Sequence, residues 1–153
     1  MSVKLSRISR VAPQLIASAR LSVETQGVGF TDITREAAAF LKEIAARDGL
    51  LLLFLRHTSA SLTIQENADP DVQRDLLTAF DRLAPEDADW IHRSEGPDDM
   101  PAHVKAMLAG VTLHVPVASG TLKLGTWQGI YLVEHRRAPH HREIVLQFLG
   151  AGA

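Results

Sequence analysis

The sequence predicts a single compact α+β domain: a largely antiparallel sheet or sandwich with two main helices and one short helix. Three observations predict it. The chain has 153 residues, the usual length of one domain. Hydrophobic residues make up 46% of the chain and charged residues 22%, which is ordinary for a globular protein. Segments with the alternation of strands flank and separate segments with helical spacing. Residues 1–153 are therefore expected to form one domain.

The first half of the chain predicts four strands and a helix, and the fourth strand is a short alternating one through Leu62 and Ile64. Apolar alternation predicts strands over 3–11 and 15–23, which together suggest an opening hairpin or meander. Helical spacing of apolar residues follows, with Asp32 or Thr31 as the expected cap and Gly49 as the stop. The continuous apolar run over 50–55 then predicts a strand that is buried on both faces.

The second half predicts two more helices and a β-rich end. Asp69 followed by Pro70 is a strong helix start, and that helix is expected to end at Pro85. Asp99 is expected to cap a short third helix that ends at Gly110. Further strands are then expected, over 111–117, 122–136 (a long strand or a tight pair) and 144–149.

Composition excludes several function classes. The chain has no cysteine, which excludes disulfides, thiol catalysis and Cys-ligated metals, so a metal site must use His and carboxylates. The formal net charge of −2 argues against a surface devoted to nucleic acid. No apolar run is long enough to cross a bilayer, and the first residues lack the apolar core of a secretory signal. We expect a soluble cytoplasmic protein with no nucleic-acid or membrane partner.

His57 is the first candidate functional residue. It follows the predicted strand over 50–55 and precedes the run Thr58-Ser59-Ala60-Ser61. A His at the end of a strand is well placed to face a pocket, although a hydrogen bond to a neighbouring carbonyl explains it equally well. A serine activated by His57 is a weaker hypothesis, because the G-x-S-x-G turn that presents such a nucleophile is missing.

A second candidate group lies between His92 and His103. These residues flank Glu95, Asp98 and Asp99 at the start of the third predicted helix. Imidazole suits zinc, nickel or iron, and carboxylates suit magnesium or manganese. The alternative is an acidic surface loop in which Asp99 only caps the helix. Clustered carboxylates repel one another unless a cation or an arginine lies close to them. The cost of this repulsion favours a functional site over a plain acidic loop.

Trp127 and Gln128 stand between Gly125 and Gly129. An exposed Trp on a bulged strand fits a contact with a ligand or a second subunit, while a buried Trp is equally compatible with the pattern.

Four segments together resemble the YjbQ-like family, also called secondary thiamine-phosphate synthase enzymes. They are His57–Ile64, Glu66–Asp71, His92 with Glu95–His103, and Leu124–Tyr131 with Glu134–Arg136. The resemblance covers nearly the whole chain. It implies a compact α+β protein that forms a homotrimer, with histidines and acids clustered between subunits. It also implies a weak activity that joins a hydroxymethylpyrimidine diphosphate to a thiazole phosphate and releases diphosphate.

The resemblance and the residue patterns select the same metal site. We expect His57, His92 and His103 to converge on one divalent metal ion, zinc or magnesium, with a coordination position open for water or substrate.

The remaining site residues are expected to serve the chemistry on a phosphorylated small-molecule substrate. Glu95 is the candidate general base or the partner of a metal-bound water, and Asp99 is the second catalytic carboxylate. Arg136 is expected to contact a phosphate, because its planar guanidinium suits that group. The alternative is a non-catalytic trimer that binds a metal or a phosphorylated ligand and whose synthase activity is incidental.

Overall fold

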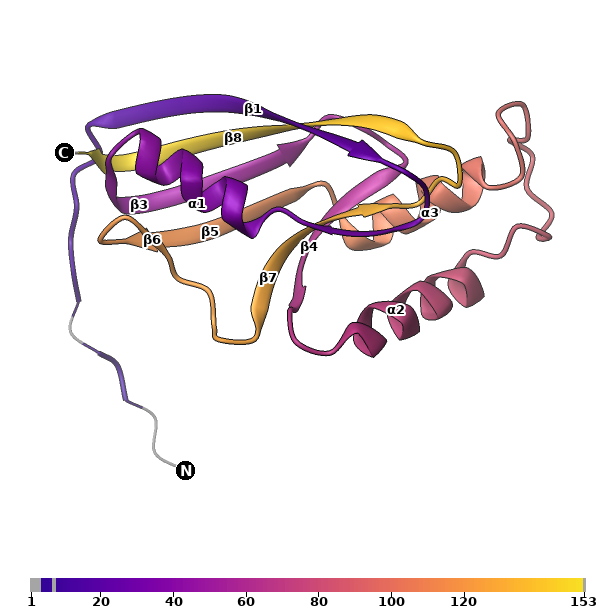
Figure 1. The fold of residues 1–153 in the computed structure, drawn as a ribbon, viewed down its shortest axis with the longest axis horizontal. Helices are drawn as coiled ribbons and strands as arrows, with labels where there is room; N and C mark the ends of the chain where they lie inside the picture. Colours follow the sequence, from indigo (N-terminus) through magenta and orange to yellow (C-terminus); the bar gives the residue numbers. More distant parts are fainter. Residues whose placement is uncertain (1–3, 7, 153) are drawn as a thin grey trace.

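The computed structural model describes residues 4–6 and 8–152 and shows one α+β domain with two antiparallel sheets and three helices in that part of the chain (Figure 1). The strands are β1 (Leu15–Thr25), β2 (Gly29–Asp32), β3 (Ala46–Leu55), β4 (Ala60–Glu66), β5 (Thr112–Ala118), β6 (Thr121–Leu122), β7 (Gln128–Glu134) and β8 (His140–Gly152). The helices are α1 (Thr34–Glu43), α2 (Pro70–Leu83) and α3 (Asp99–Ala109). The predicted fold class is confirmed.

One sheet has five strands in the order β1-β8-β3-β5-β6, and the other has three in the order β2-β7-β4. Every pair of neighbouring strands is antiparallel. The core joins both sheets to α1: Leu41 of α1, Leu51 of β3, Leu62 of β4 and Leu132 of β7 are each fully buried in one hydrophobic cluster. Each of these strands therefore contributes one apolar face to this cluster, as expected for antiparallel sheets.

The predicted strand over 3–11 is not formed in the residues that the structure describes, and Val3 and Arg7 lie outside them. The side chains of Leu5 and Ile8 are exposed, so burial of these apolar residues does not stabilise a strand in this segment. The second predicted strand is β1, and its partner is β8 at the other end of the chain rather than the N-terminal segment.

The first helix is shorter than predicted. Residue Ile33 occupies the N-cap position without a side-chain cap, while Asp32 accepts the backbone N–H of Thr34 at 2.8 Å. The helix ends at Glu43, because β3 already begins at Ala46. Gly49 is therefore not the helix stop.

Gly49 instead lies opposite Gly150, where β3 approaches β8. A Cβ built on Gly49 would lie 2.7 Å from the Cα of Gly150 and 2.8 Å from the ring of Phe148. Only glycine allows this close approach of the two strands, and the aromatic ring covers it.

The strand over 50–55 is buried on one face only, which corrects the prediction. Leu51 and Leu53 are fully buried, whereas Leu50 is 37% exposed and Phe54 is 42% exposed. The continuous apolar run predicted two covered faces, but no helix of the described chain covers the outer face of the five-stranded sheet near Leu50.

The second helix begins and ends as predicted. Asp69 accepts the backbone N–H of Asp71 at 2.9 Å and Pro70 is the first helical residue, while the helix ends before Pro85. None of the described helices is long and apolar enough to cross a membrane.

The third helix corrects one expectation. Asp98, not Asp99, is its N-cap residue, and Asp99 makes no capping hydrogen bond. Gly110 ends it with φ of +88°, a conformation that favours glycine. This helix has 11 residues and α1 has 10, so the expectation that the third helix is shorter than the other two is wrong.

In the C-terminal third, β5 matches the strand predicted over 111–117. The segment 122–136 holds the end of β6 and all of β7, which lie in different sheets, so it forms neither one long strand nor a tight pair. Strand β8 begins at His140, before the predicted start at Ile144.

Candidate metal centre

Three side chains converge where the loop after α2 meets the start of α3. His92 comes from that loop, Asp99 from the first turn of α3, and His103 from the next turn of the same helix. Residues four apart on a helix lie on one face, which brings His103 over Asp99. Ligand atoms from all three residues lie within 4.8 Å of one another. The structure thus brings together three of the predicted site residues.

Asp99 lies at the centre of this cluster. Its Oδ2 is 2.8 Å from Nε2 of His92 and 3.4 Å from Nε2 of His103. The Asp99 side chain is only 3% exposed, whereas His92 and His103 are partly exposed. The cluster therefore combines a buried carboxylate, that of Asp99, with two imidazoles that remain accessible to a ligand.

The second nitrogen of His103 fixes the orientation of its ring. Nδ1 donates to the backbone carbonyl of Thr58 at 3.0 Å. Because a carbonyl only accepts, the neutral ring carries its proton on Nδ1 and its lone pair on Nε2. Metal-ligating histidines are typically oriented by a hydrogen bond of this kind.

Arg136 holds the other oxygen of Asp99. Its guanidinium bonds to Oδ1 of Asp99 through Nη1, to Oδ2 of Asp98 through Nε at 3.2 Å, and to the carbonyl of Glu95 through Nη2 at 2.7 Å. The Arg136 side chain is largely buried. The predicted phosphate contact of Arg136 stays a prediction, and the observed partners of this guanidinium are acidic side chains and a carbonyl.

Asp98 is a residue whose role the sequence did not indicate. It accepts from the backbone N–H of Arg137 at 2.9 Å as well as from Arg136. Burial alone would raise the pKa of Asp98, but these hydrogen bonds and the positive charge of Arg136 outweigh it and lower that pKa. Asp98 thus stays ionised and holds Arg136 against Asp99.

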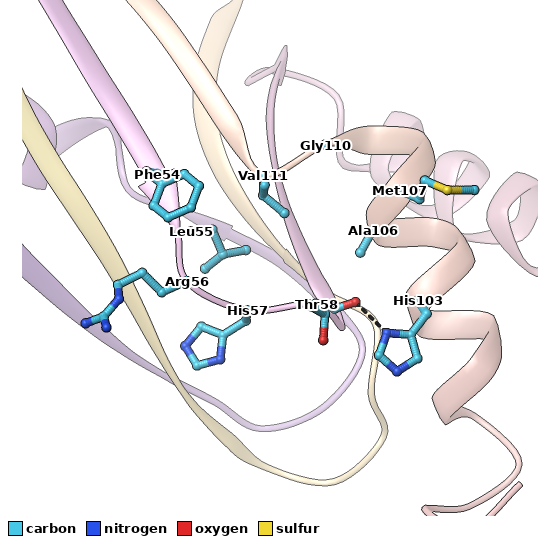
Figure 2. A pocket seen from close by; sticks show the side chains of 10 residues that line it. All are labelled: Phe54, Leu55, Arg56, His57, Thr58, His103, Ala106, Met107, Gly110 and Val111. Atoms are coloured by element: carbon cyan, nitrogen blue, oxygen red, sulfur yellow. Dashed lines mark hydrogen bonds between the residues drawn. The ribbon is translucent and has the colours of Figure 1, made fainter. Parts of the chain in front are cut away.

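His57 lies outside the cluster formed by His92, Asp99 and His103. Its Nε2 accepts the backbone N–H of Glu143 at 2.9 Å. His57 and His103 instead line the same pocket, with Thr58 between them (Figure 2). The predicted convergence of three histidines on one ion is therefore not seen within a single chain.

The Glu95 side chain is exposed on the loop before α3 and has no hydrogen-bond or ion-pair partner among residues 4–6 and 8–152. Only its backbone carbonyl is engaged, by Arg136. Its role as a general base stays a prediction.

A buried polar network is linked through Arg136 to the cluster of His92, Asp99 and His103, and sequence analysis missed it. Arg142 donates to both oxygens of Glu134, through Nε at 2.7 Å, and to the hydroxyl of Ser59 at 3.1 Å. Burial would raise the pKa of Glu134, but the hydrogen bonds from Arg142, Arg136 and Thr25 lower it.

The serine hypothesis receives no support from the geometry. Ser61 is paired with His135 at 2.8 Å rather than with His57, and both members of this pair are buried away from solvent. A nucleophile needs access to its substrate, which this pair lacks.

Trp127 lies in the loop before β7 with its side chain 67% exposed. The loop is held by Asn67, which donates to the carbonyls of Thr126 and Gln128, each at 3.3 Å, and by Gln128, which accepts from Gly125 at 2.8 Å. The indole is thus presented to solvent by a well-bonded loop.

The donor set of the cluster fits a divalent metal ion. Two imidazole nitrogens and one carboxylate oxygen are the three protein ligands of many catalytic zinc sites, which leave a fourth position open. Ligand atoms about 2.0–2.2 Å from one ion lie within about 4 Å of each other, so the observed spread needs only a small adjustment. The hydrogen bond that His103 donates to the carbonyl of Thr58 and the one that Asp99 accepts from Arg136 are the outer contacts that such ligands use.

Comparison with known proteins gives the family. The model of the UPF0047, YjbQ-like family matches residues 19–151, which include every residue of the cluster. The chain belongs to the YjbQ-like family. A UPF0047 protein of Synechocystis is 46% identical over 131 residues, covering 85% of this chain and 89% of that protein. YjbQ of Escherichia coli O157:H7 is 41% identical, with 85% and 95% covered.

Solved structures share the fold of this chain. An uncharacterized YjbQ/UPF0047 protein from Clostridium acetobutylicum has a TM-score of 0.80 and 39% identity, covering 85% of this chain and 98% of that one. A hypothetical protein from Aeropyrum pernix has a TM-score of 0.81 and 28% identity, with 88% and 99% covered. The structural likeness thus extends over nearly the whole length of both.

Proposed function

We propose that this chain binds a divalent cation at His92, Asp99 and His103 and uses that site to act on a phosphorylated small molecule. The convergence of these three side chains supports the proposal. Two imidazoles and one carboxylate favour zinc over magnesium, which prefers oxygen ligands and keeps several waters.

The reaction proposed is the one that the family resemblance implies, a thiamine-phosphate synthase reaction. The bond between the pyrimidine methylene carbon and the diphosphate oxygen breaks, and a bond from that carbon to the thiazole nitrogen forms. The electron pair of the broken bond leaves with diphosphate. A bound divalent cation supplies neutralisation of the charge that develops on this leaving group.

The chain's own residues hold and orient the site. Arg136 fixes Asp99 through one carboxylate oxygen, so that the other oxygen faces the imidazoles. The carbonyl of Thr58 fixes the ring of His103. Glu95 is proposed to accept a hydrogen bond from a water bound at the exposed edge of the cluster.

We also propose that the chain forms a homotrimer. Ile16, Leu149 and Leu50 form a row across β1, β8 and β3, and their side chains are exposed on the outer face of the five-stranded sheet. A contiguous exposed apolar surface is typical of an interface between proteins. The exposed Trp127 supports a further subunit contact.

The experiment combines metal analysis with turnover. The purified protein is expected to contain about one divalent ion per chain, and to convert the pyrimidine diphosphate and thiazole phosphate to thiamine phosphate with saturation kinetics. Chelation and Asp99→Asn are each expected to abolish both properties. Metal binding without saturable turnover would contradict the synthase proposal and favour the non-catalytic binding alternative.

A further inference from the structure

A pocket of about 630 Å³ opens beside the metal centre, and His103 belongs to both (Figure 2). Pockets that bind small molecules usually have volumes of about 300–1,000 Å³ and mainly apolar walls. The walls here are formed largely by Phe54, Leu55, Ala106, Met107 and Val111. Among the described residues that line the pocket, none is acidic.

His57 offers this pocket a hydrogen-bond donor whose position is fixed by the backbone. The N–H of Glu143 donates to Nε2 of His57 at 2.9 Å, so the neutral ring must carry its proton on Nδ1. Burial, followed by the positive charge of Arg142, lowers the pKa of His57, which keeps the ring neutral at pH 7. Nδ1 of His57 has no hydrogen-bond partner among the described residues.

We propose that this pocket binds the apolar part of a small molecule, and that Nδ1–H of His57 donates to a carbonyl oxygen or ring nitrogen on it. The pocket then selects ligands with an acceptor at that point, because a ligand without one leaves the His57 donor without a partner. The inference rests on the proposed function in one respect, namely that the other end of the ligand reaches the cluster at His103. It assigns His57 a role in specificity rather than metal binding.

Two probes of equal shape test the donor. Acetophenone and α-methylstyrene differ in having a carbonyl oxygen or a methylene group at the same place, so only acetophenone can accept from His57. Both are titrated into the metal-loaded protein by NMR. We expect acetophenone to bind about fivefold more tightly, the preference that one ordinary hydrogen bond supplies. Equal affinities would overturn the proposal.

Two variants of similar volume locate the effect. His57→Leu removes the donor and is expected to abolish the preference while leaving the affinity for α-methylstyrene unchanged. His57→Asn keeps a donor near the place of Nδ1 and is expected to retain part of the preference. A preference that persists in His57→Leu would show that another group makes the contact and would overturn the role given to His57.

Two measurements separate this inference from the proposed function. Zinc content of His57→Leu is expected to equal that of the wild type, and loss of the ion would show His57 to be a metal ligand instead. Nitrogen chemical shifts of the wild-type His57 ring are expected to report the Nδ1–H tautomer at pH 7, and the opposite tautomer would overturn the proposal. A protein that binds no metal and has no synthase turnover, but keeps the probe preference, would contradict only the proposed function.

Discussion

Arg136 bonds to one carboxylate oxygen of Asp99 and leaves the other oxygen facing His92 and His103. The two partners are 37 residues apart in the chain. Burial of this pair leaves Asp99 with little freedom to rotate, since its side chain is 3% exposed and Arg136 is itself held by Asp98. The guanidinium therefore sets the direction in which Asp99 presents its second oxygen to a metal ion.

Replacing Arg136 tests this arrangement. Arg136→Lys keeps the charge but loses the planar fork, so Asp99 is expected to lose its fixed orientation. We expect zinc affinity to fall about 10- to 100-fold, as for other outer contacts of metal ligands, while saturating zinc still loads one site. Competition with a chelating dye measures this. Arg74→Lys on the exposed face of α2 is the control, and an equal fall in both variants would argue against a positioning role.

Replacing Asp99 separates binding from folding. Asp99→Asn removes the charged ligand but keeps an oxygen that can accept from Arg136. We expect zinc binding to disappear and stability to fall by about 1–3 kcal/mol, because a charge-assisted hydrogen bond is weakened rather than lost. Calorimetric titration and thermal unfolding check the two effects. An Asn variant that binds zinc like the wild type would exclude Asp99 as a ligand.

Local signals in the sequence predict the helices and strands better than they predict which polar residues contact one another. The start of α2 was predictable because the cap and the first helical residue, Asp69 and Pro70, are adjacent in the chain. The predicted capping role of Asp99 is wrong, because Asp99 bonds instead to Arg136, which is distant in sequence. Both oxygens of Asp99 are engaged by Arg136 and His92, so neither caps the helix.

The same limit explains β3 and His57. The apolar run over 50–55 indicated a strand, but only the pairing of β3 with β5 and β8 determines which face the rest of the chain covers. His57 lines a pocket at a strand end, which is one of the two alternatives that the sequence leaves open. Its contact with the backbone of Glu143, 86 residues away, could not be read from neighbouring residues.

Glu95 is expected to act in turnover and not in folding. Glu95→Gln keeps the shape and removes the charge that would orient a metal-bound water, so we expect turnover to fall at least about tenfold with an unchanged melting temperature, since outer contacts of a metal site typically contribute about 10- to 100-fold. Asp89→Asn, a fully exposed carboxylate in the same loop, is the control and is expected to have no effect. Wild-type turnover in the Gln variant would mean that Glu95 is only a solvated loop charge.

Trp127 is expected to stabilise the proposed trimer. Trp127→Ala removes an exposed indole held by a well-bonded loop, and we expect the mass measured by light scattering to fall from that of a trimer toward that of a monomer. Ile91→Ala is the matched control, because the Ile91 side chain is fully exposed outside this loop. A Trp127 variant with the mass and thermal stability of the wild type would count against this interface.

His135 is expected to make the protein less stable in mild acid. Its ring is 2% exposed, its Nδ1 is a buried polar atom without a hydrogen-bond partner among the described residues, and it packs edge-on against Phe80. Burial, with the positive charge of Lys105, lowers its pKa to about 4 from the usual 6.5. Between these two values the unfolded chain binds a proton that the folded chain excludes.

The sign of the effect follows from this difference in bound protons. Stability is unaffected by His135 above pH 6.5, declines as the pH falls from 6.5 to about 4, and loses on the order of 3 kcal/mol over that range. The lowered pKa of His57 adds a loss of the same sign. The lowered pKa of Glu134 acts at lower pH, below its ordinary value of 4.5.

Urea unfolding at several pH values measures the slope. His135→Gln keeps a group that can bond to Ser61 but does not titrate, so we expect it to flatten the decline between pH 6.5 and about 4. His114→Gln, at an exposed position on β5, is expected to leave the decline unchanged. A slope as steep in His135→Gln as in the wild type would show that His135 is not the group that excludes the proton. The prediction that His135 stays neutral in the folded chain would then be wrong.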